Sequence, residues 1–302
     1  MQKPEKLLII LAFFSIYVIW GSTYLLNKIS VSQLSPLMLA GIRFTTAGGL
    51  IFVIILLLGK SLKITKKQFL NSVFAGFLFL VIGNGGVVWA LRYVDSNFAA
   101  LEISSQPLVV LLLMWMLQGK KIKKESIIGI FLGIAGIYLL VSQKQVIGDH
   151  QSIWGMLTIF LCMTSWGYAS IFVGTADLPK NYLVNTGYQM LSGGIILLIG
   201  SVLVGEEWLA YSAWQPRVKL SMLMLVIFGS IVAFTSFNFL LRRVSPEKVA
   251  TSTYVNPIIA MFLGWYFLDE LITTQGILAA VILLTGVYFI NRTKAKPVAR
   301  KI

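Results

Sequence analysis

Apolar runs long enough to cross a lipid bilayer recur along this 302-residue chain and constrain its fold more than any other feature. A bilayer core about 30 Å thick needs roughly 20 apolar residues in a helix. We predict helices at 7–27, 37–58, 69–91, 97–118, 126–142, 153–174, 182–204, 220–241, 247–268 and 273–291. Backbone groups in lipid must be satisfied within the protein, which favours helices over open sheet. The predicted fold class is an all-α integral membrane protein with ten transmembrane helices.

The composition supports lipid as the main solvent. Apolar residues make up 57% of the chain and charged residues 12%, whereas soluble domains carry about 25% charged residues. The net charge of +14 raises the possibility of a nucleic-acid partner. The basic residues lie in short clusters between apolar runs, however, and no nucleic-acid-binding motif accompanies them. We therefore predict the bilayer, and no nucleic acid, as a partner.

The basic residues also predict the orientation. With ten helices both termini lie on one side of the membrane, and 19 of the 25 Lys and Arg residues fall in segments on that side. Five fall on the opposite side, and Arg43 lies within the second predicted helix. Because cytoplasmic loops are enriched in Lys and Arg, both termini are predicted to be cytoplasmic. The predicted location is the cell (plasma or inner) membrane, as a multi-pass protein.

An internal repeat organises the chain. A shift of 150 residues places Leu91–Ser142 on Leu241–Arg292 without a gap, with eleven identical residues. Chance would give about three to five identities between membrane helices of this composition. Each half then holds five helices, an odd number, so the second half enters the membrane in the opposite orientation. We predict two inverted five-helix repeats, at residues 1–145 and 146–302.

Short motifs occur in matching order in the two predicted halves. They are Trp20-Gly21-Ser22, Arg43-Phe44, Gln106-Pro107, Trp166-Gly167, Tyr188-Gln189, Asn256-Pro257 and Asp269-Glu270. In this arrangement the chain resembles the EamA family of the drug/metabolite transporter superfamily over nearly its whole length. The resemblance implies a central cavity lined mainly by the first, third, fourth, sixth, eighth and ninth helices. It also implies transport of amino acids, related metabolites, drugs or nucleotide-linked compounds. Gly119-Lys120 departs from the acidic residue that is usual at this point in the family.

Polar residues at bilayer depth are the candidate site residues, because burying them in lipid is costly. Glu102, Ser105 and Gln106 share one face of the fourth predicted helix, and Ser252 and Asn256 are the repeat partners of Glu102 and Gln106. A desolvated carboxylate favours its protonated form, so Glu102 is a candidate for binding a coupling proton. The alternative is a structural carboxylate, paired for example with Arg92.

The remaining candidate substrate-binding residues lie on neighbouring predicted helices. They are Trp20, Asn84, Trp166, Asn238 and Tyr254. Trp20 and Trp166 form either an aromatic wall or interfacial anchors. Asn84 and Asn238 either face the cavity or bond between helices. Pro107 and Pro257 each free a backbone carbonyl, which predicts hinges or static bends. For Arg43, close to the start of its helix, we expect snorkelling to the interface rather than pairing with a carboxylate.

No catalytic, cofactor or metal site is predicted. The chain has no Walker A motif, no nucleophile elbow and no His/Cys metal spacing. We predict a secondary active transporter, an exporter of small polar metabolites such as amino acids, that works by alternating access between the two halves. An integral membrane enzyme or a channel is the alternative, but neither needs two exchangeable halves.

Overall fold

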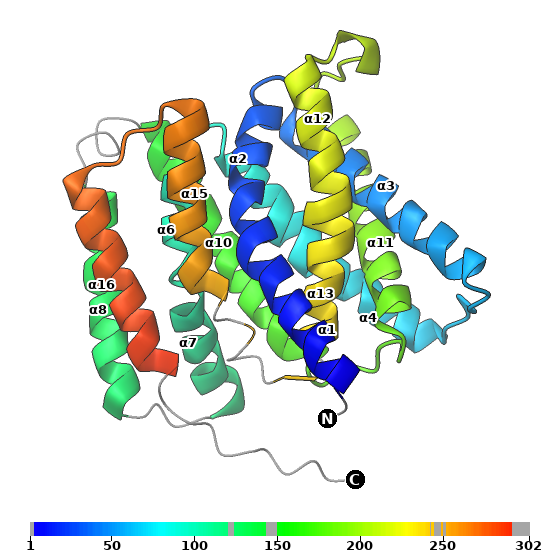
Figure 1. Ribbon diagram of the computed structural model, residues 1–302, viewed down its shortest axis with the longest axis horizontal. Helices are drawn as coiled ribbons and strands as arrows, with labels where there is room; N and C mark the ends of the chain where they lie inside the picture. The colour runs from blue at the N-terminus through cyan, green and yellow to red at the C-terminus, as the bar shows by residue number, and fades with distance from the viewer. Residues whose placement is uncertain are drawn as a thin grey trace.

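A computed structural model describes residues 3–119, 124–142, 150–241, 243–244, 249 and 252–291. Regular structure in this part of the chain is entirely helical (Figure 1). The first-half helices are α1 (Lys3–Phe14), η1 (Ser15–Ile19), α2 (Trp20–Val31), α3 (Pro36–Leu57), α4 (Lys66–Gly76), η2 (Phe77–Gly85), α5 (Gly86–Ala90), α6 (Ser96–Ile103), α7 (Gln106–Gln118) and α8 (Lys124–Val141). The second-half helices are α10 (His150–Val173), α11 (Tyr182–Leu203), η3 (Tyr211–Ala213), α12 (Pro216–Met224), η4 (Leu225–Val232), α13 (Ala233–Leu241), α15 (Ser252–Leu268) and α16 (Thr274–Asn291).

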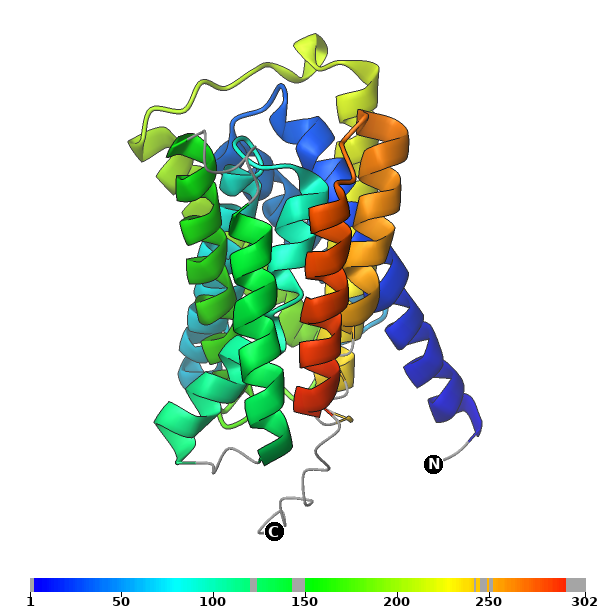
Figure 2. The same ribbon diagram turned by 90° about the vertical axis from the view of Figure 1, so that its left-hand side faces the viewer.

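Consecutive helices join into long apolar rods. Seven rods in the described residues are long and apolar enough to cross a membrane: Lys6–Val31, Pro36–Leu57, Lys66–Ala90, Ser96–Gln118, His150–Val173, Tyr182–Leu203 and Pro216–Leu241. Three shorter apolar helices are Ile127–Leu139, Val255–Leu268 and Thr274–Gly286. These ten segments lie where the sequence predicts helices, although the eighth begins at Pro216, earlier than expected. The start of α1 and the end of α16 lie at the same end of the bundle (Figures 1 and 2).

Short local signals start and stop the helices. Pro36 opens α3 at a position where its missing N–H costs nothing. At the start of α4, Thr65 Oγ1 accepts from the backbone N–H of Gln68 at 3.1 Å, and Gln68 Oε1 accepts from that of Thr65 at 3.3 Å. Left-handed glycines follow three of the helices, and these are Gly59, Gly119 and Gly205. The helix boundaries therefore follow from local chemistry as well as from hydropathy.

Glycines bring helices from the two halves into close contact. α3 packs along α11, and a Cβ added at Gly48 would lie 2.6 Å from the backbone nitrogen of Leu191. α8 packs along α16, and a Cβ at Gly136 would lie 2.6 Å from Cγ of Leu283. Small residues allow such approaches in membrane bundles, where packing rather than the hydrophobic effect drives helix association. In both pairs, a helix of one half therefore meets its predicted counterpart in the other.

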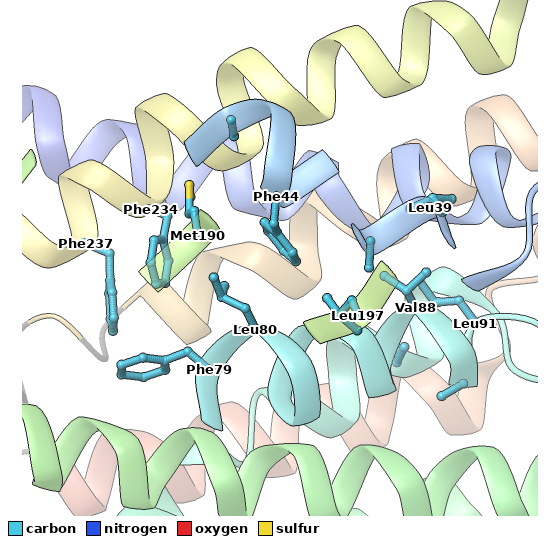
Figure 3. Packing of buried hydrophobic residues seen from close by; sticks show 14 of the residues in the cluster. Leu39, Phe44, Phe79, Leu80, Val88, Leu91, Met190, Leu197, Phe234 and Phe237 are labelled. Atoms are coloured by element: carbon cyan, nitrogen blue, oxygen red, sulfur yellow. The ribbon is translucent and has the colours of Figure 1, made fainter. Parts of the chain in front are cut away.

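The interior of the bundle is packed with apolar side chains, and many more apolar side chains point outward. Figure 3 shows Phe44 on α3, Leu80 on η2, Met190 on α11 and Phe234 on α13 gathered in one region of the interior. Outside, Leu57 is 82% exposed, and similarly exposed apolar residues follow the rods around the bundle. Soluble monomers rarely expose this much apolar surface, whereas a surface that faces lipid is expected to do so.

Candidate functional site

An aromatic cluster fills the interior where the predicted halves meet. We define it as Trp20, Phe79, Trp166, Phe234 and Phe237. The rings of Trp20 and Trp166 lie edge to face with centroids 5.8 Å apart, and Trp166 lies 4.8 Å from Phe79. Phe79, Phe234 and Phe237 lie close together in Figure 3. The two repeat-related tryptophans thus contact each other where the predicted halves meet.

π-helical segments position this cluster. η2 carries Phe79, and η4 ends two residues before Phe234. η2 interrupts the rod Lys66–Ala90 and η4 interrupts the rod Pro216–Leu241, at corresponding places. Carbonyls of these segments accept bonds from opposing helices. Cys162 Sγ donates to Ile82 O at 3.1 Å, and Trp20 Nε1 donates to Gly229 O at 3.3 Å. π-helical turns are rare and concentrate at functional sites.

Arg43 is buried, which corrects the expectation that it snorkels. Its side chain is 2% exposed. Nε donates to Ser230 Oγ at 2.8 Å, and Nη1 donates to Asn27 Oδ1 at 3.3 Å and to Asn84 Oδ1 at 3.5 Å. Three polar side chains from α2, η2 and η4 therefore hold the guanidinium inside the protein. Without these partners the long side chain would have extended to the membrane interface. Asn84, a predicted site residue, thus bonds between helices, one of its two predicted alternatives.

Glu102 is buried on α6, which packs against α15, α10 and α2. The side chain is 4% exposed, and its Oε2 atom has no hydrogen-bond partner among the described residues. Its backbone oxygen accepts from Ser105 Oγ at 2.7 Å. Glu102 forms no ion pair with Arg92 or any other described residue. An orphaned carboxylate inside a membrane protein is costly, which marks Glu102 as a functional candidate.

The two repeat-related amides make equivalent bonds across the halves. Gln106 Nε2 donates to Met163 O at 2.9 Å. The Asn256 amide, oriented so that its nitrogen faces the neighbouring carbonyls, donates to Tyr17 O at 2.7 Å. Met163 and Tyr17 each lie three residues before one of the two tryptophans, Trp166 and Trp20. Each amide therefore ties its own half to the other half beside the aromatic cluster, and the two amides do not bond each other.

Asn238 bonds between helices, one of its two predicted alternatives, within a buried polar network whose other members the sequence reasoning missed. Its Nδ2 donates to Thr186 Oγ1 at 3.0 Å and to Gln189 Oε1 at 3.3 Å. Gln189 Nε2 donates to Asn185 Oδ1 at 3.2 Å, and Ser72 Oγ donates to the same oxygen at 3.3 Å. The network joins α13, α11 and α4. The motif Tyr188-Gln189 was the available signal, because a polar pair inside an apolar run needs buried partners.

The other predicted site residues differ in their place along the helices. Ser252 is buried at the start of α15, and its Oγ donates to Val249 O at 3.2 Å. The side chain of Tyr254 lies outside the described part of the structure. Pro107 lies just after the break between α6 and α7, whereas Pro257 lies within the continuous helix α15. The two prolines therefore differ in their local geometry.

Two carboxylates cap helices of the other half. Glu270 accepts from the backbone nitrogens of Ser96 at 2.8 Å and Asn97 at 3.0 Å, at the start of α6. Glu206 accepts from those of Leu37 at 3.0 Å and Met38 at 2.8 Å, at the start of α3. Carboxylates bind helix N-termini because free N–H groups and the helix dipole both favour negative charge. Glu270 was part of the family resemblance, and Glu206 carried no sequence signal.

Acidic, His and Cys side chains are otherwise scattered. Within the residues that the structure describes, no three of them gather closely enough to hold a metal ion. The buried candidate groups described above are amides, hydroxyls, one carboxylate and one guanidinium. Such groups bind small polar molecules through hydrogen bonds and charge.

Comparisons with known proteins identify transporters that are similar to this chain. A model of the EamA-like transporter family matches residues 7–142 and again residues 153–292. The "Uncharacterized inner membrane transporter YedA" of Escherichia coli K12 is 34% identical, over 96% of this chain and 94% of the relative. The "Probable amino-acid metabolite efflux pump" of the same organism is 25% identical, over 90% of this chain and 91% of the relative.

A solved crystal structure shares the fold. It matches with a TM-score of 0.66 at 18% identity, over 92% of this chain and 94% of the other. The relative "Uncharacterized transporter YoaV" of Bacillus subtilis is 22% identical, over 93% of this chain and 95% of the relative. The family model covers most of the chain, and the described helices supply the membrane-crossing lengths that such a family needs. The chain therefore belongs to the EamA-like transporter family and is a membrane transporter.

Proposed function

We propose that this transporter is a secondary active exporter of small polar metabolites such as amino acids. It alternates access between two inverted repeats, residues 1–145 and 146–302, each with five spanning helices and with both termini in the cytoplasm. The equivalent bonds Gln106–Met163 and Asn256–Tyr17 support the pairing of the halves. So do the contacts of α3 with α11 and of α8 with α16. An inverted repeat lets one half take up the conformation of the other.

The substrate lies beside the aromatic cluster, between α6–α7 and α15. Glu102, Gln106, Ser252, Tyr254 and Asn256 border it on these helices. Asn84 and Asn238 supply polar groups from η2 and α13, and Trp20 and Trp166 supply an aromatic wall that suits a cationic ammonium. Pro107, next to the helix break after α6, and Pro257 act as hinges. The name of the 25% identical relative, a probable amino-acid metabolite efflux pump, supports both the substrate class and the direction.

The observation that carries the proposal is the orphaned carboxylate of Glu102. A carboxylate without a partner in a low-dielectric interior gains from protonation or from an arriving ammonium group. Alternating access exposes it to each side in turn, which couples transport to a proton gradient. Ser252 occupies the equivalent place in the second half, so one half alone carries the coupling group.

Reconstituted protein tests this proposal. Proteoliposomes loaded with a radiolabelled amino-acid mixture should release label faster when a pH gradient is imposed. Glu102→Gln keeps the side-chain shape and should remove the dependence on the gradient. Glu207→Gln, which alters an exposed carboxylate, is the matched control and should keep it. Transport by Glu102→Gln with an unchanged rate and pH profile would show that the coupling role is wrong.

A further inference from the structure

Arg43 carries a buried positive charge whose partners are all neutral. The three acceptors around its guanidinium belong to Ser230, Asn27 and Asn84. No ion pair of Arg43 occurs in the described part of the chain. A guanidinium stays protonated at neutral pH, and placing its charge in a membrane interior without a counter-charge costs several kcal/mol. A bound anion beside the guanidinium would therefore stabilise the buried positive charge of Arg43.

Nη2 of the guanidinium has no acceptor among the residues that the structure describes. A guanidinium has five N–H donors, and the three bonds of Arg43 use Nε and Nη1. Nη2 lies against Gly229, where an added Cβ would come within 3.1 Å of it. A larger residue at this position would cover Nη2, whereas glycine leaves it uncovered. The remaining N–H donors on Nη2 can make a charge-assisted hydrogen bond to a carboxylate oxygen.

This uncovered side adjoins the aromatic cluster. The carbonyl of Gly229 accepts from Trp20 Nε1 at 3.3 Å, so the indole and the guanidinium meet at one residue of η4. Trp20 in turn packs against Trp166 and Phe237. An anionic group held at Nη2 would therefore belong to a molecule lying beside this cluster.

Arg43 and Glu102 also lie at similar distances along their helices. Arg43 is seven residues beyond Pro36 at the start of α3, and Glu102 is six residues beyond Ser96 at the start of α6. At 1.5 Å per residue, each lies about 10 Å along its helix from its first residue. Both helices begin at the same end of the bundle (Figure 1). Among the described residues, the interior thus holds one unmatched cation and one unmatched carboxylate, the charge pattern complementary to a zwitterion.

We propose that Arg43, positioned by Asn27, Asn84 and Ser230, binds the carboxylate of the transported molecule through Nη2 beside Gly229. This inference rests on the proposed function, because it assigns one end of the same substrate. It narrows the substrates to molecules with a carboxylate and selects amino acids over the corresponding amines. The three neutral partners orient the guanidinium without neutralising it, which keeps its charge available to the substrate.

A comparison of matched ligands tests the assignment on the unaltered protein. The twenty common amino acids, their amides and their decarboxylated amines are each added to purified protein in detergent, and the thermal midpoint and Trp fluorescence are recorded. At least one amino acid should raise the midpoint, and its amide and amine should bind at least tenfold more weakly. Equal effects of acid and amide would overturn the proposal, as would a panel in which no amino acid has an effect.

Variants separate binding from structural support. Arg43→Gln should weaken binding of the stabilising amino acid by about 10- to 100-fold, the range expected for a charge-assisted bond, and should leave amide binding unchanged. Arg43→Lys should retain part of the preference. Gly229→Ala keeps the charge but covers Nη2, so it should lower affinity for the acid alone. A Gly229→Ala protein that retains the full preference for acid over amide would contradict the proposed location.

Transport data distinguish this inference from the broader proposal. Proteoliposomes that move amines or amides as fast as amino acids would refute the role of Arg43 and leave a transporter in place. Proteoliposomes that move none of these probes would refute both the proposed substrate class and this site.

Discussion

The cap that Glu270 places on α6 gives the sharpest prediction of stability. Its carboxylate is buried and accepts three bonds, from the nitrogens of Ser96 and Asn97 and from Ser96 Oγ at 2.9 Å. The residue before the helix, Asp95, makes no side-chain cap of its own. α6 therefore depends on a residue 174 positions away for the satisfaction of its first N–H groups.

Glu270→Gln removes the charge and one of the two acceptor oxygens. Hydrogen bonds to charged groups contribute about 1.5–3 kcal/mol and neutral ones about 1 kcal/mol, and the helix dipole adds about 0.3–1 kcal/mol. The loss of one bond and the weakening of the others should lower the free energy of unfolding by roughly 2–4 kcal/mol. At about 2 °C per kcal/mol for a chain of this size, the midpoint should fall by roughly 4–8 °C.

The assay is thermal unfolding of the purified protein in detergent, followed by Trp fluorescence. Asp269→Asn is the matched control, because it removes the neighbouring carboxylate and Asn tolerates the left-handed φ of 53° at this position. Ser96→Ala, alone and combined with Glu270→Gln, should show a non-additive effect, since the two side chains share one bond. Equal midpoints for Glu270→Gln and Asp269→Asn would refute the reasoning.

Three further predictions follow from other contacts. Gly48→Ala should lower the thermal midpoint because the added Cβ would lie 2.6 Å from Leu191 N. Gly49→Ala has open space around the added Cβ and should be neutral or stabilise the protein by up to about 1 kcal/mol. Midpoints in the reverse order would contradict the α3–α11 contact. Glu206→Gln should lower the midpoint as Glu270→Gln does, with Glu207→Gln as control, and an unchanged midpoint would exclude a stabilising cap on α3. Cys162 is 2% exposed, so maleimide labelling measured by mass spectrometry should require denaturation, and rapid labelling of the native protein would contradict this packing.

Sequence alone located the helices and the kind of protein. An apolar run of bilayer length has one stable conformation in lipid, because its backbone must bond within the segment. The stops at Gly59, Gly119 and Gly205 were equally local, since each needs only a residue that accepts a left-handed conformation. The motifs around Trp20 and Trp166 also indicated the family, because their order along the chain requires no knowledge of packing.

Tertiary structure decided where the polar side chains point. Arg43, Gln106 and Asn256 could each have faced lipid headgroups, substrate or another helix. Their bonds include those to Asn27, Met163 and Tyr17, which lie 16, 57 and 239 positions away in the chain. The sequence places Glu206 and Glu270 in loops and does not show that they cap helices. Only the tertiary structure brings the N-termini of α3 and α6 beside these carboxylates. A buried polar group is satisfied by whichever partner the packing of the whole bundle brings within about 3 Å, and hydropathy and spacing along one segment contain no information about that partner.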